Sequence, residues 1–332
     1  MRIVLCYPVE EKHIAQIAAA MPGAEVIDAG QERVAEELFN ADIFCGHAKV
    51  PVDWDGVVRQ GRLRWIQSSA AGMDHCLVPS VIDSDIAVTS ASGVLADQVA
   101  EHTIALMTGW SRSLPVFFRA QQNREFIRRP TRDLTRSTVG IVGLGGNGRR
   151  LAEILVPFQS RILATDLFPV DPPRGVESLW PADRLDDLLA ASDFLVLCLP
   201  LNESTRGMID AAALRKMKPG SLLVNVARGP IVVTADLEAA MEHGLLAGAV
   251  MDVTDPEPLP LDSRLWDMPN VIITPHVGGQ SSWRIDNMTR LFCRNLRRWQ
   301  LGLPLVNYLT HKRLGFPIRG GGCPLWGEPV EP

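Results

Sequence analysis

Short apolar runs alternate with stretches of helical periodicity along the first part of the chain. This alternation is typical of a parallel sheet whose faces are covered by helices. We therefore predict that the chain begins with a small α/β domain of flavodoxin-like type. Its strands are expected at 3–7, 25–28, 42–46, 63–68 and 86–89, with helices between several of them, including 12–20 and 33–39.

A second set of apolar runs follows between residues 138 and 277. Several of these runs are apolar throughout, as expected for strands that are covered on both faces. The pattern predicts six strands in a doubly wound, Rossmann-type domain. The strands are expected at 138–142, 161–165, 193–199, 221–225, 247–251 and 271–274, and the helices at 149–158, 185–191, 211–217 and 235–242.

The segment that joins the two regions shows helical spacing over residues 97–122. Pro115 is expected to kink or divide this helix, because proline removes a backbone N–H and crowds the preceding turn. Residues 117–132 mix aromatic and basic side chains without a clear period, and we expect an arm there rather than a core element. The residues that show the helical spacing are Val99, Thr103, Leu106 and Met107.

The end of the chain contains one more helical stretch, at 281–300, which is predicted to return the chain to the first domain. The second domain, 98–284, is then an insertion into a first domain made of 1–97 and 285–332. Residues 311–332 are rich in Gly and Pro and are expected to form a mobile tail. The alternative is that the tail docks on the protein or on a second subunit through Phe316, Leu325 and Trp326.

The composition of the chain indicates which classes of partner and which cellular compartment to expect. A net charge of −5 gives no basic face for nucleic acid, and no apolar run is long enough to cross a bilayer. The N-terminus enters a strand at once, so we expect no signal peptide. The six cysteines are scattered without any metal-binding spacing. We therefore predict a cytoplasmic protein with no metal site, no membrane partner and no nucleic-acid partner.

Glycines follow the first strand of the second domain with the spacing G-x-G-x-x-G, at Gly143, Gly145 and Gly148. In a dinucleotide site the first permits a tight turn, the second lets a pyrophosphate approach the backbone, and the third lets the helix pack closely. The next strand ends in Asp166, which is placed to accept hydrogen bonds from an adenosine ribose. This carboxylate would repel a 2′-phosphate, which favours NAD over NADP. The alternative is a glycine turn that binds no ligand.

Three later strand ends carry polar side chains, Arg228, Glu257 and His276. Ligands of open α/β sheets bind beyond the carboxyl ends of the strands. An arginine there could hold a carboxylate with two parallel hydrogen bonds. A carboxylate beside an imidazole favours the protonated ring and one tautomer, so the Glu–His pair could pass a proton to a carbonyl oxygen. Each residue alone could be a turn or solvated residue, and only together do they favour a site.

The motifs together resemble the D-isomer-specific 2-hydroxyacid dehydrogenases, in their short form without a regulatory domain. The resemblance covers about residues 60–310. It rests on Ala70-Ala-Gly-Met-Asp-His75, Val99-Ala-Glu-His102, the glycine motif, Leu199-Pro-Leu-Asn-Glu-Ser-Thr205, Asn225-Val-Ala-Arg-Gly229, the segment 252–260 and Pro269-Asn-Val-Ile-Ile-Thr-Pro-His276.

This resemblance implies an oxidoreductase that transfers hydride between NAD(H) and a 2-keto or D-2-hydroxy acid, such as glyoxylate or hydroxypyruvate. It implies that Arg228 and the turn at Ala71 and Gly72 bind the substrate carboxylate, that His276 moves the proton and that Glu257 supports it. Members usually dimerise through the helix and arm at 97–132. The implied cofactor contacts are Gly143, Gly145, Gly146, Asn147, Gly148, Asp166, Pro200, Thr205, Ala227, Asp252, His276 and Gly278.

A second function remains open at this point. Some proteins that resemble this family bind NAD(H) as sensors and act as transcriptional corepressors with little turnover. The intact Arg228, Glu257 and His276 favour an enzyme, although such sensors can retain these residues.

Overall fold

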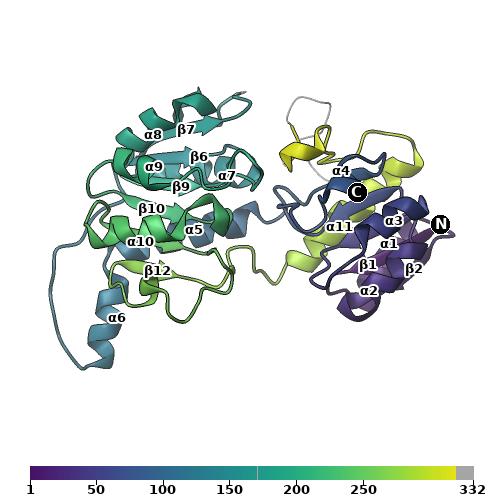
Figure 1. Cartoon of the computed structure of the whole chain (residues 1–332), viewed down its shortest axis with the longest axis horizontal. Helices are drawn as coiled ribbons and strands as arrows, with labels where there is room; N and C mark the ends of the chain where they lie inside the picture. Colours follow the sequence, from purple (N-terminus) through teal and green to yellow (C-terminus); the bar gives the residue numbers. More distant parts are fainter. Residues whose placement is uncertain (170, 319–332) are drawn as a thin grey trace. The chain divides into compact units, whose positions relative to one another are not determined.

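The computed structural model describes residues 1–169 and 171–318, which form two compact units (Figure 1). Unit 1 contains Met1–Leu95 and the described residues from Ser281 onward, and unit 2 is Ala96–Gln280. The second unit is therefore inserted into the first. The division predicted from the sequence, at 97/98 and 284/285, lies within a few residues of the observed one.

Unit 1 is built on a five-stranded parallel sheet with the order β2-β1-β3-β4-β5. This is the flavodoxin-like order, and the predicted fold of this part is confirmed. The strands are β1 (Arg2–Cys6), β2 (Glu25–Asp28), β3 (Ile43–Gly46), β4 (Trp65–Ser68) and β5 (Ala87–Thr89). The helices are α1 (Glu11–Ala20), α2 (Gly30–Glu37), α3 (Trp54–Gln60), α4 (Pro79–Ile82) and α11 (Arg284–Gln300).

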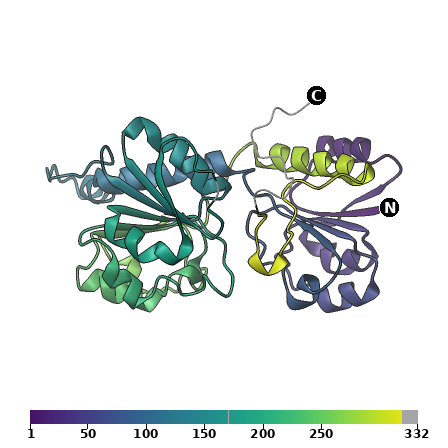
Figure 2. The same cartoon turned by 90° about the horizontal axis from the view of Figure 1, so that it is seen from above.

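Helices cover both faces of this sheet (Figure 2). α1 and α11 bury one face, where Phe292 of α11 packs against Trp65 of β4. α2, α3 and α4 bury the other face through residues such as Val34 and Val57. Buried side chains of α11 recur every three to four residues, which gives the helix a single apolar stripe. The predicted return of the chain at 281–300 is therefore correct.

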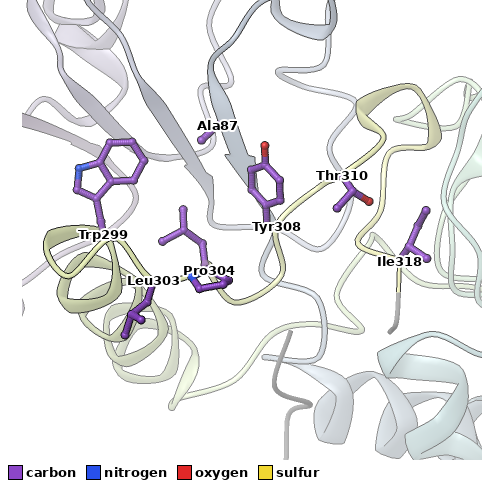
Figure 3. A pocket seen from close by; sticks show the side chains of 9 residues that line it. Ala87, Trp299, Leu303, Pro304, Tyr308, Thr310 and Ile318 are labelled. Atoms are coloured by element: carbon purple, nitrogen blue, oxygen red, sulfur yellow. The ribbon is translucent and has the colours of Figure 1, made fainter. Parts of the chain in front are cut away.

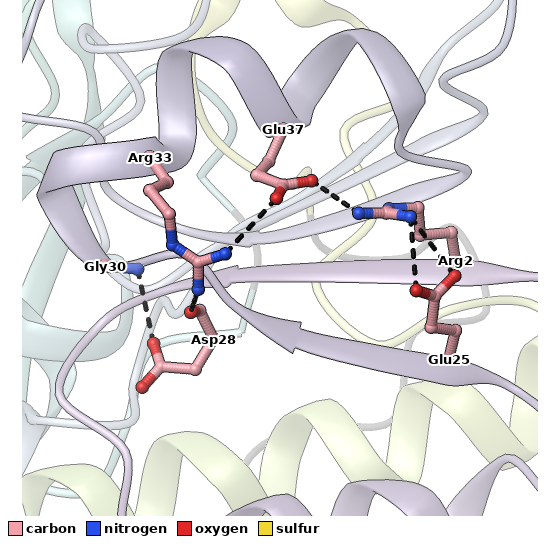
Figure 4. A network of polar contacts seen from close by, with 6 residues as sticks. All are labelled: Arg2, Glu25, Asp28, Gly30, Arg33 and Glu37. Carbon is pink, nitrogen blue, oxygen red and sulfur yellow. Dashed lines mark hydrogen bonds and ion pairs between the residues drawn. The ribbon is translucent and has the colours of Figure 1, made fainter.

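A network of charged side chains joins β1, β2 and α2 at the surface (Figure 4). Arg2 pairs with Glu25 at 3.2 Å and with Glu37 at 2.6 Å. Arg33 pairs with the same Glu37 at 3.4 Å and donates to the carbonyl of Asp28. Glu37 thus receives two guanidinium groups, and the network fixes α2 against the edge of the sheet.

Unit 2 is built on a seven-stranded parallel sheet with the order β12-β11-β10-β9-β6-β7-β8. The predicted Rossmann-type architecture is confirmed, but the predicted number of six strands is wrong. The missed strand, β8, lies at the sheet edge and is only half-buried, so it lacks a continuous apolar run. The strands are β6 (Thr138–Val142), β7 (Arg161–Asp166), β8 (Val176–Pro181), β9 (Phe194–Leu197), β10 (Leu222–Asn225), β11 (Gly248–Met251) and β12 (Val271–Ile273).

The helices of unit 2 also form two layers. α5 and α7 pack on one face with residues such as Met107 and Leu151. α8, α9 and α10 pack on the opposite face, through Leu188, Leu214 and Leu237 respectively. The bounds are α5 (Ala96–Ser111), α7 (Gly146–Leu155), α8 (Leu185–Ala191), α9 (Ala211–Lys216) and α10 (Thr234–Glu242).

Pro115 divides the helix expected at 97–122, as the sequence predicted. α5 ends at Ser111, Ser113 adopts a left-handed conformation with φ 60°, and α6 (Leu114–Gln122) begins with the proline in its first turn. The arm expected at 117–132 is therefore helical up to Gln122. Only Ala120 of α6 is buried, so this helix contributes little to the core.

The segment at the end of the described chain is held on unit 1. The Lys312 ammonium group donates to the carbonyls of Val81 at 3.0 Å and Ser84 at 2.5 Å, and Arg313 pairs with Asp83 at 2.7 Å. The prediction of a mobile tail is wrong for this part. The remaining tail, with Leu325 and Trp326, lies outside the described residues. Among the described helices, none is long and apolar enough to span a membrane.

Candidate active site

The residues predicted to do chemistry in unit 2 lie beyond the carboxyl ends of parallel strands. Asp166 ends β7, Arg228 follows β10, Asp252 follows β11 and His276 follows β12. The glycine motif follows β6, where the strand order changes direction between β6 and β9. Such a switch point is the usual ligand crevice of a doubly wound sheet.

The glycine turn has the geometry that a diphosphate requires. Gly143 has φ 92°, and an added Cβ would lie 2.8 Å from the carbonyl oxygen of Cys198. At Gly148 an added Cβ would lie 2.2 Å from the carbonyl oxygen of Gly143, so only glycine lets α7 approach the turn. A Cβ at Gly145 would meet nothing within 4 Å. Open space thus faces the amino end of α7, whose N–H groups favour anions, and these residues fit a dinucleotide.

Asp166 ties the glycine turn to the end of β7. Its Oδ2 accepts a hydrogen bond from the Leu144 N–H at 2.7 Å, and its Oδ1 accepts one from the Phe168 N–H at 2.9 Å. An ionised carboxylate has about four acceptor positions, so both oxygens can still accept ribose hydroxyls.

The loop that carries Arg228 is organised by Asn225. The side chain of Asn225 accepts from the Ala227 N–H and donates to the carbonyl of Arg228, both at 3.0 Å. The guanidinium of Arg228 donates to the carbonyl of Ala227 at 2.7 Å. A Cβ at Gly229 would lie 1.8 Å from the carbonyl oxygen of Thr254. The glycine therefore lets the Arg228 loop pack directly on the loop that leads to Glu257.

Glu257 and His276 form the pair that the sequence predicted. Nδ1 of His276 lies 2.8 Å from Oε1 of Glu257, and each side chain is 44% exposed. The carboxylate is an acceptor, so Nδ1 carries the proton of this hydrogen bond. Nε2 is then the ring nitrogen that can exchange a proton with a ligand. His276 has φ 55°, an uncommon backbone conformation, and its N–H donates to the carbonyl of Asp252 at 2.7 Å.

Asp252 is 3% exposed and accepts hydrogen bonds from both sides of the turn that follows β12. Burial would raise the pKa of Asp252, but hydrogen bonds from His102, Thr274 and the N–H groups of Val277 and Gly278 outweigh it. The pKa therefore lies below its ordinary value, and the carboxylate is ionised near neutral pH.

His102 on α5 is a part of this cluster that we did not predict as a site residue. Its Nε2 lies 3.2 Å from Asp252 Oδ1 and 3.2 Å from Thr274 Oγ1. The available signals were its place in the motif at 99–102 and a polar ring near the apolar positions of the helix.

The other predicted residues lie in two further turns. Thr205 donates to the carbonyl of Pro200 at 2.8 Å and closes the loop after β9. Ala71 and Gly72 belong to unit 1 and follow β4. The Ser68 hydroxyl accepts from the Ala70 N–H at 3.0 Å, donates to the Ala70 carbonyl at 3.1 Å and shapes that turn.

A cavity of about 480 Å³ in unit 1 is lined by apolar groups such as Trp299 and Leu303, and no predicted site residue lines it (Figure 3). Among the described residues, no three His, Cys, Asp or Glu side chains are arranged to hold a metal ion.

The comparison with known families identifies the chain. The model described as "D-isomer specific 2-hydroxyacid dehydrogenase, NAD binding domain" matches residues 104–278, more than half of the chain. The chain belongs to the D-isomer specific 2-hydroxyacid dehydrogenase family. The resemblance seen in the sequence is confirmed, and this dehydrogenase is an oxidoreductase with an NAD(P)-binding domain.

Similarity to known proteins and to solved structures supports this assignment. The dehydrogenase is 35% identical to a glyoxylate reductase of Thermofilum pendens over 70% of this chain and 71% of that protein. It is similar to the structure of a family member from Xanthobacter autotrophicus Py2 in complex with NADPH and MES, with a TM-score of 0.81, 28% identity and coverage of 94% and 98%. A glyoxylate/hydroxypyruvate reductase from Sinorhizobium meliloti in complex with NADP and sulfate gives a TM-score of 0.80, 27% identity and coverage of 95% and 99%.

Proposed function

We propose that this dehydrogenase reduces small 2-keto acids to D-2-hydroxy acids with NADH and catalyses the reverse oxidation. Glyoxylate and hydroxypyruvate are the first substrates to consider, because they name the activities of the two reductases described above. The observation that carries the proposal is the 2.8 Å hydrogen bond between Glu257 and His276 at the carboxyl edge of a dinucleotide-binding sheet.

Substrate binding and proton transfer are assigned to different residues. Arg228 and the turn at Ala71 and Gly72 bind the carboxylate of the keto acid, which orients its carbonyl group. His276 donates the proton on Nε2 to the carbonyl oxygen, and Glu257 stabilises the charged ring by accepting from Nδ1. The bound cofactor supplies the hydride. In the oxidation His276 accepts the hydroxyl proton instead.

The cofactor in this proposal is NAD rather than NADP. Asp166 supports this choice, because its carboxylate can accept from both ribose hydroxyls and repels a 2′-phosphate. The two structures described above hold NADPH and NADP, so the choice needs a direct test. The contacts proposed are Gly143, Gly145, Gly146, Asn147 and Gly148 at the diphosphate, Asp166, Pro200 and Thr205 on the adenosine side, and Ala227, Asp252, His276 and Gly278 at the nicotinamide.

The cofactor choice predicts an NADH preference of at least about tenfold in kcat/KM over NADPH, which corresponds to about 1.4 kcal/mol. Steady-state rates with both cofactors at fixed keto acid measure it. Equal use of the two cofactors would contradict the role given to Asp166.

We also propose a cytoplasmic homodimer. The exposed apolar side chains of α6 and the segment after it support the dimer, since Phe118 is 58% exposed and Phe126 is 94% exposed. The described cysteines are all free thiols, which is consistent with a reducing compartment.

The deciding experiment measures NADH oxidation with glyoxylate, hydroxypyruvate and phenylpyruvate, and determines the configuration of the product. We expect turnover of at least one keto acid and a D product. Binding of NADH without turnover of any keto acid would overturn the enzyme and favour the sensor function instead.

A further inference from the structure

We propose that His102 is a positioning residue that fixes the carboxylate of Asp252, so that Oδ2 faces the primary amide of the nicotinamide ring. The inference rests on the proposed function, which places Asp252 near the nicotinamide. It adds a residue on α5 to the nicotinamide end of the site, where the other proposed residues lie in loops after strands.

The hydrogen bonds to Asp252 are divided unevenly between its two oxygens. Oδ1 lies 2.6 Å from Thr274 Oγ1, 3.0 Å from the Val277 nitrogen and 3.2 Å from His102 Nε2. Oδ2 receives one bond, from the Gly278 N–H at 2.9 Å. Each carboxylate oxygen has about two acceptor positions. Oδ1 is therefore saturated, while Oδ2 keeps a position for an amide N–H of a ligand.

The same contacts determine which nitrogen of His102 carries the proton. Thr274 donates its only hydroxyl proton to Asp252, so its oxygen can only accept from His102 Nε2. The Asp252 carboxylate is also an acceptor. Nε2 therefore carries hydrogen and donates to both oxygens. A side chain that places an amide N–H at this point can replace the imidazole, whereas an apolar side chain cannot.

The turn after β12 packs tightly against Asp252 and His102. A Cβ added at Gly278 would lie 2.9 Å from Asp252 Oδ2 and 3.3 Å from Cδ2 of His102. Without the imidazole, the remaining donors to Asp252 are Thr274, Val277 and Gly278, which all belong to the segment after β12. The carboxylate would then no longer be held from α5, and the direction of Oδ2 would depend on that one segment alone.

The test compares binding of NADH with binding of its reduced 3-acetylpyridine analogue, in which an acetyl group replaces the carboxamide and no N–H remains. Dissociation constants are measured by calorimetry for the wild type, His102→Leu and His102→Gln. We expect His102→Leu to weaken NADH by about tenfold, a factor typical of one lost hydrogen bond to a charged group, and the analogue much less. His102→Gln should restore the preference for NADH.

Two controls accompany these measurements. His243→Leu removes an exposed histidine of unit 2 whose Nδ1 contacts the carbonyl of Ala239 in its own turn, and it should change neither constant. If His102→Leu folds poorly, His102→Asn is used, because its shorter amide does not reach the carboxylate. Amide exchange at Val277 and Gly278 in the cofactor-free protein should be faster in His102→Leu than in the wild type.

The possible failures can be told apart. Equal weakening of NADH and analogue in His102→Leu, or no weakening of either, would overturn the positioning role while leaving the enzyme intact. A wild type that binds NADH no better than the analogue would overturn the presentation of Oδ2 to the amide. A wild type that binds no NADH would overturn the proposed function, and this inference with it.

Discussion

At the residue scale, the proposed chemistry depends on side chains that are far apart in the sequence and neighbours at the sheet edge. Glu257 and His276 could be predicted as a pair because both follow strands of the same predicted sheet, and they are hydrogen-bonded. His102 lies in the motif at 99–102, but its role could not be predicted. The motif does not indicate the carboxylate that it contacts, which lies 150 residues further along the chain.

Arg228 is expected to act mainly on substrate binding. Arg228→Ala should raise the KM for the keto acid by about 10- to 100-fold, since a bond between charged groups contributes about 1.5–3 kcal/mol. Steady-state kinetics measure this effect. Arg215→Ala, which removes an exposed arginine of α9, serves as the control. An unchanged KM in Arg228→Ala would remove this residue from the site.

Glu257 is expected to act on the proton transfer. Glu257→Gln keeps an acceptor for Nδ1 of His276 but removes the charge that stabilises the imidazolium form. We expect kcat to fall by about a hundredfold, within the range typical of general acid–base catalysis. Asp262→Asn, an exposed acid in the same loop, is the matched control. Wild-type kcat in Glu257→Gln would mean that His276 works without this partner.

At the scale of elements, the site depends on loops that pack directly on one another. Gly229 allows this contact, because its Cα faces the carbonyl of Thr254 in the next loop. Gly229→Ala would place a methyl group 1.8 Å from that oxygen, and the backbone would have to move. Overpacking of this kind costs about 1–3 kcal/mol of stability.

The measurement for Gly229→Ala is chemical denaturation together with kcat/KM, and both should fall. Gly109→Ala is the control, because a Cβ at this position in α5 would come no closer than 3.8 Å to its neighbour. That substitution should be neutral or stabilising by up to about 1 kcal/mol, as expected for alanine in a helix. Equal stability of the two variants would contradict the packing argument.

Asp193 joins elements at the amino ends of the strands, on the side of the same sheet opposite to the proposed site. It lies 2.6 Å from the ammonium group of Lys218 and accepts from the Thr138 N–H at 2.8 Å. Burial would raise the pKa of Asp193, but these hydrogen bonds outweigh it and hold the pKa below its ordinary value. The group therefore stabilises the folded state above its unfolded pKa of about 3.9, and this contribution is lost as pH falls through the folded value.

Asp193→Asn should accordingly be less stable than the wild type near neutral pH, and the difference should shrink below about pH 4. Urea denaturation across a pH series measures it. Asp183→Asn, at an exposed position, should show no such difference. A stability gap that stays constant down to low pH would show that the charge of Asp193 is not responsible.

At the scale of the whole molecule, the chain passes twice between the two units, because unit 2 is inserted into unit 1. Both segments of unit 2 that lead to unit 1 contribute a residue that contacts Asp252, namely His102 and Gly278. α5, which carries His102, begins at the first residue of unit 2, and Gly278 lies shortly before its last residue, Gln280. The contacts of Asp252 thus join both connecting segments within unit 2.

The proposed dimer depends on the exposed aromatic side chains of the arm. Replacing Phe118 and Phe126 together by Ser should shift sedimentation from dimer to monomer, because both rings are exposed in the single chain. Leu261→Ser is the control, since Leu261 is 97% exposed and lies outside the arm. A double variant that sediments like the wild type would place the interface elsewhere.

The sequence by itself determined the layered α/β architecture and most strands, because a strand covered on both faces must be apolar along its whole length. It also determined the glycine turn, where only glycine satisfies the backbone. The edge strand β8 and the number of strands were decided by the tertiary structure, since a half-buried strand has no distinctive pattern. The same holds for the contact of His102 with Asp252. The local pattern of apolar and polar residues indicates which side of an element is buried. Only the order of strands in the sheet determines which distant side chains meet.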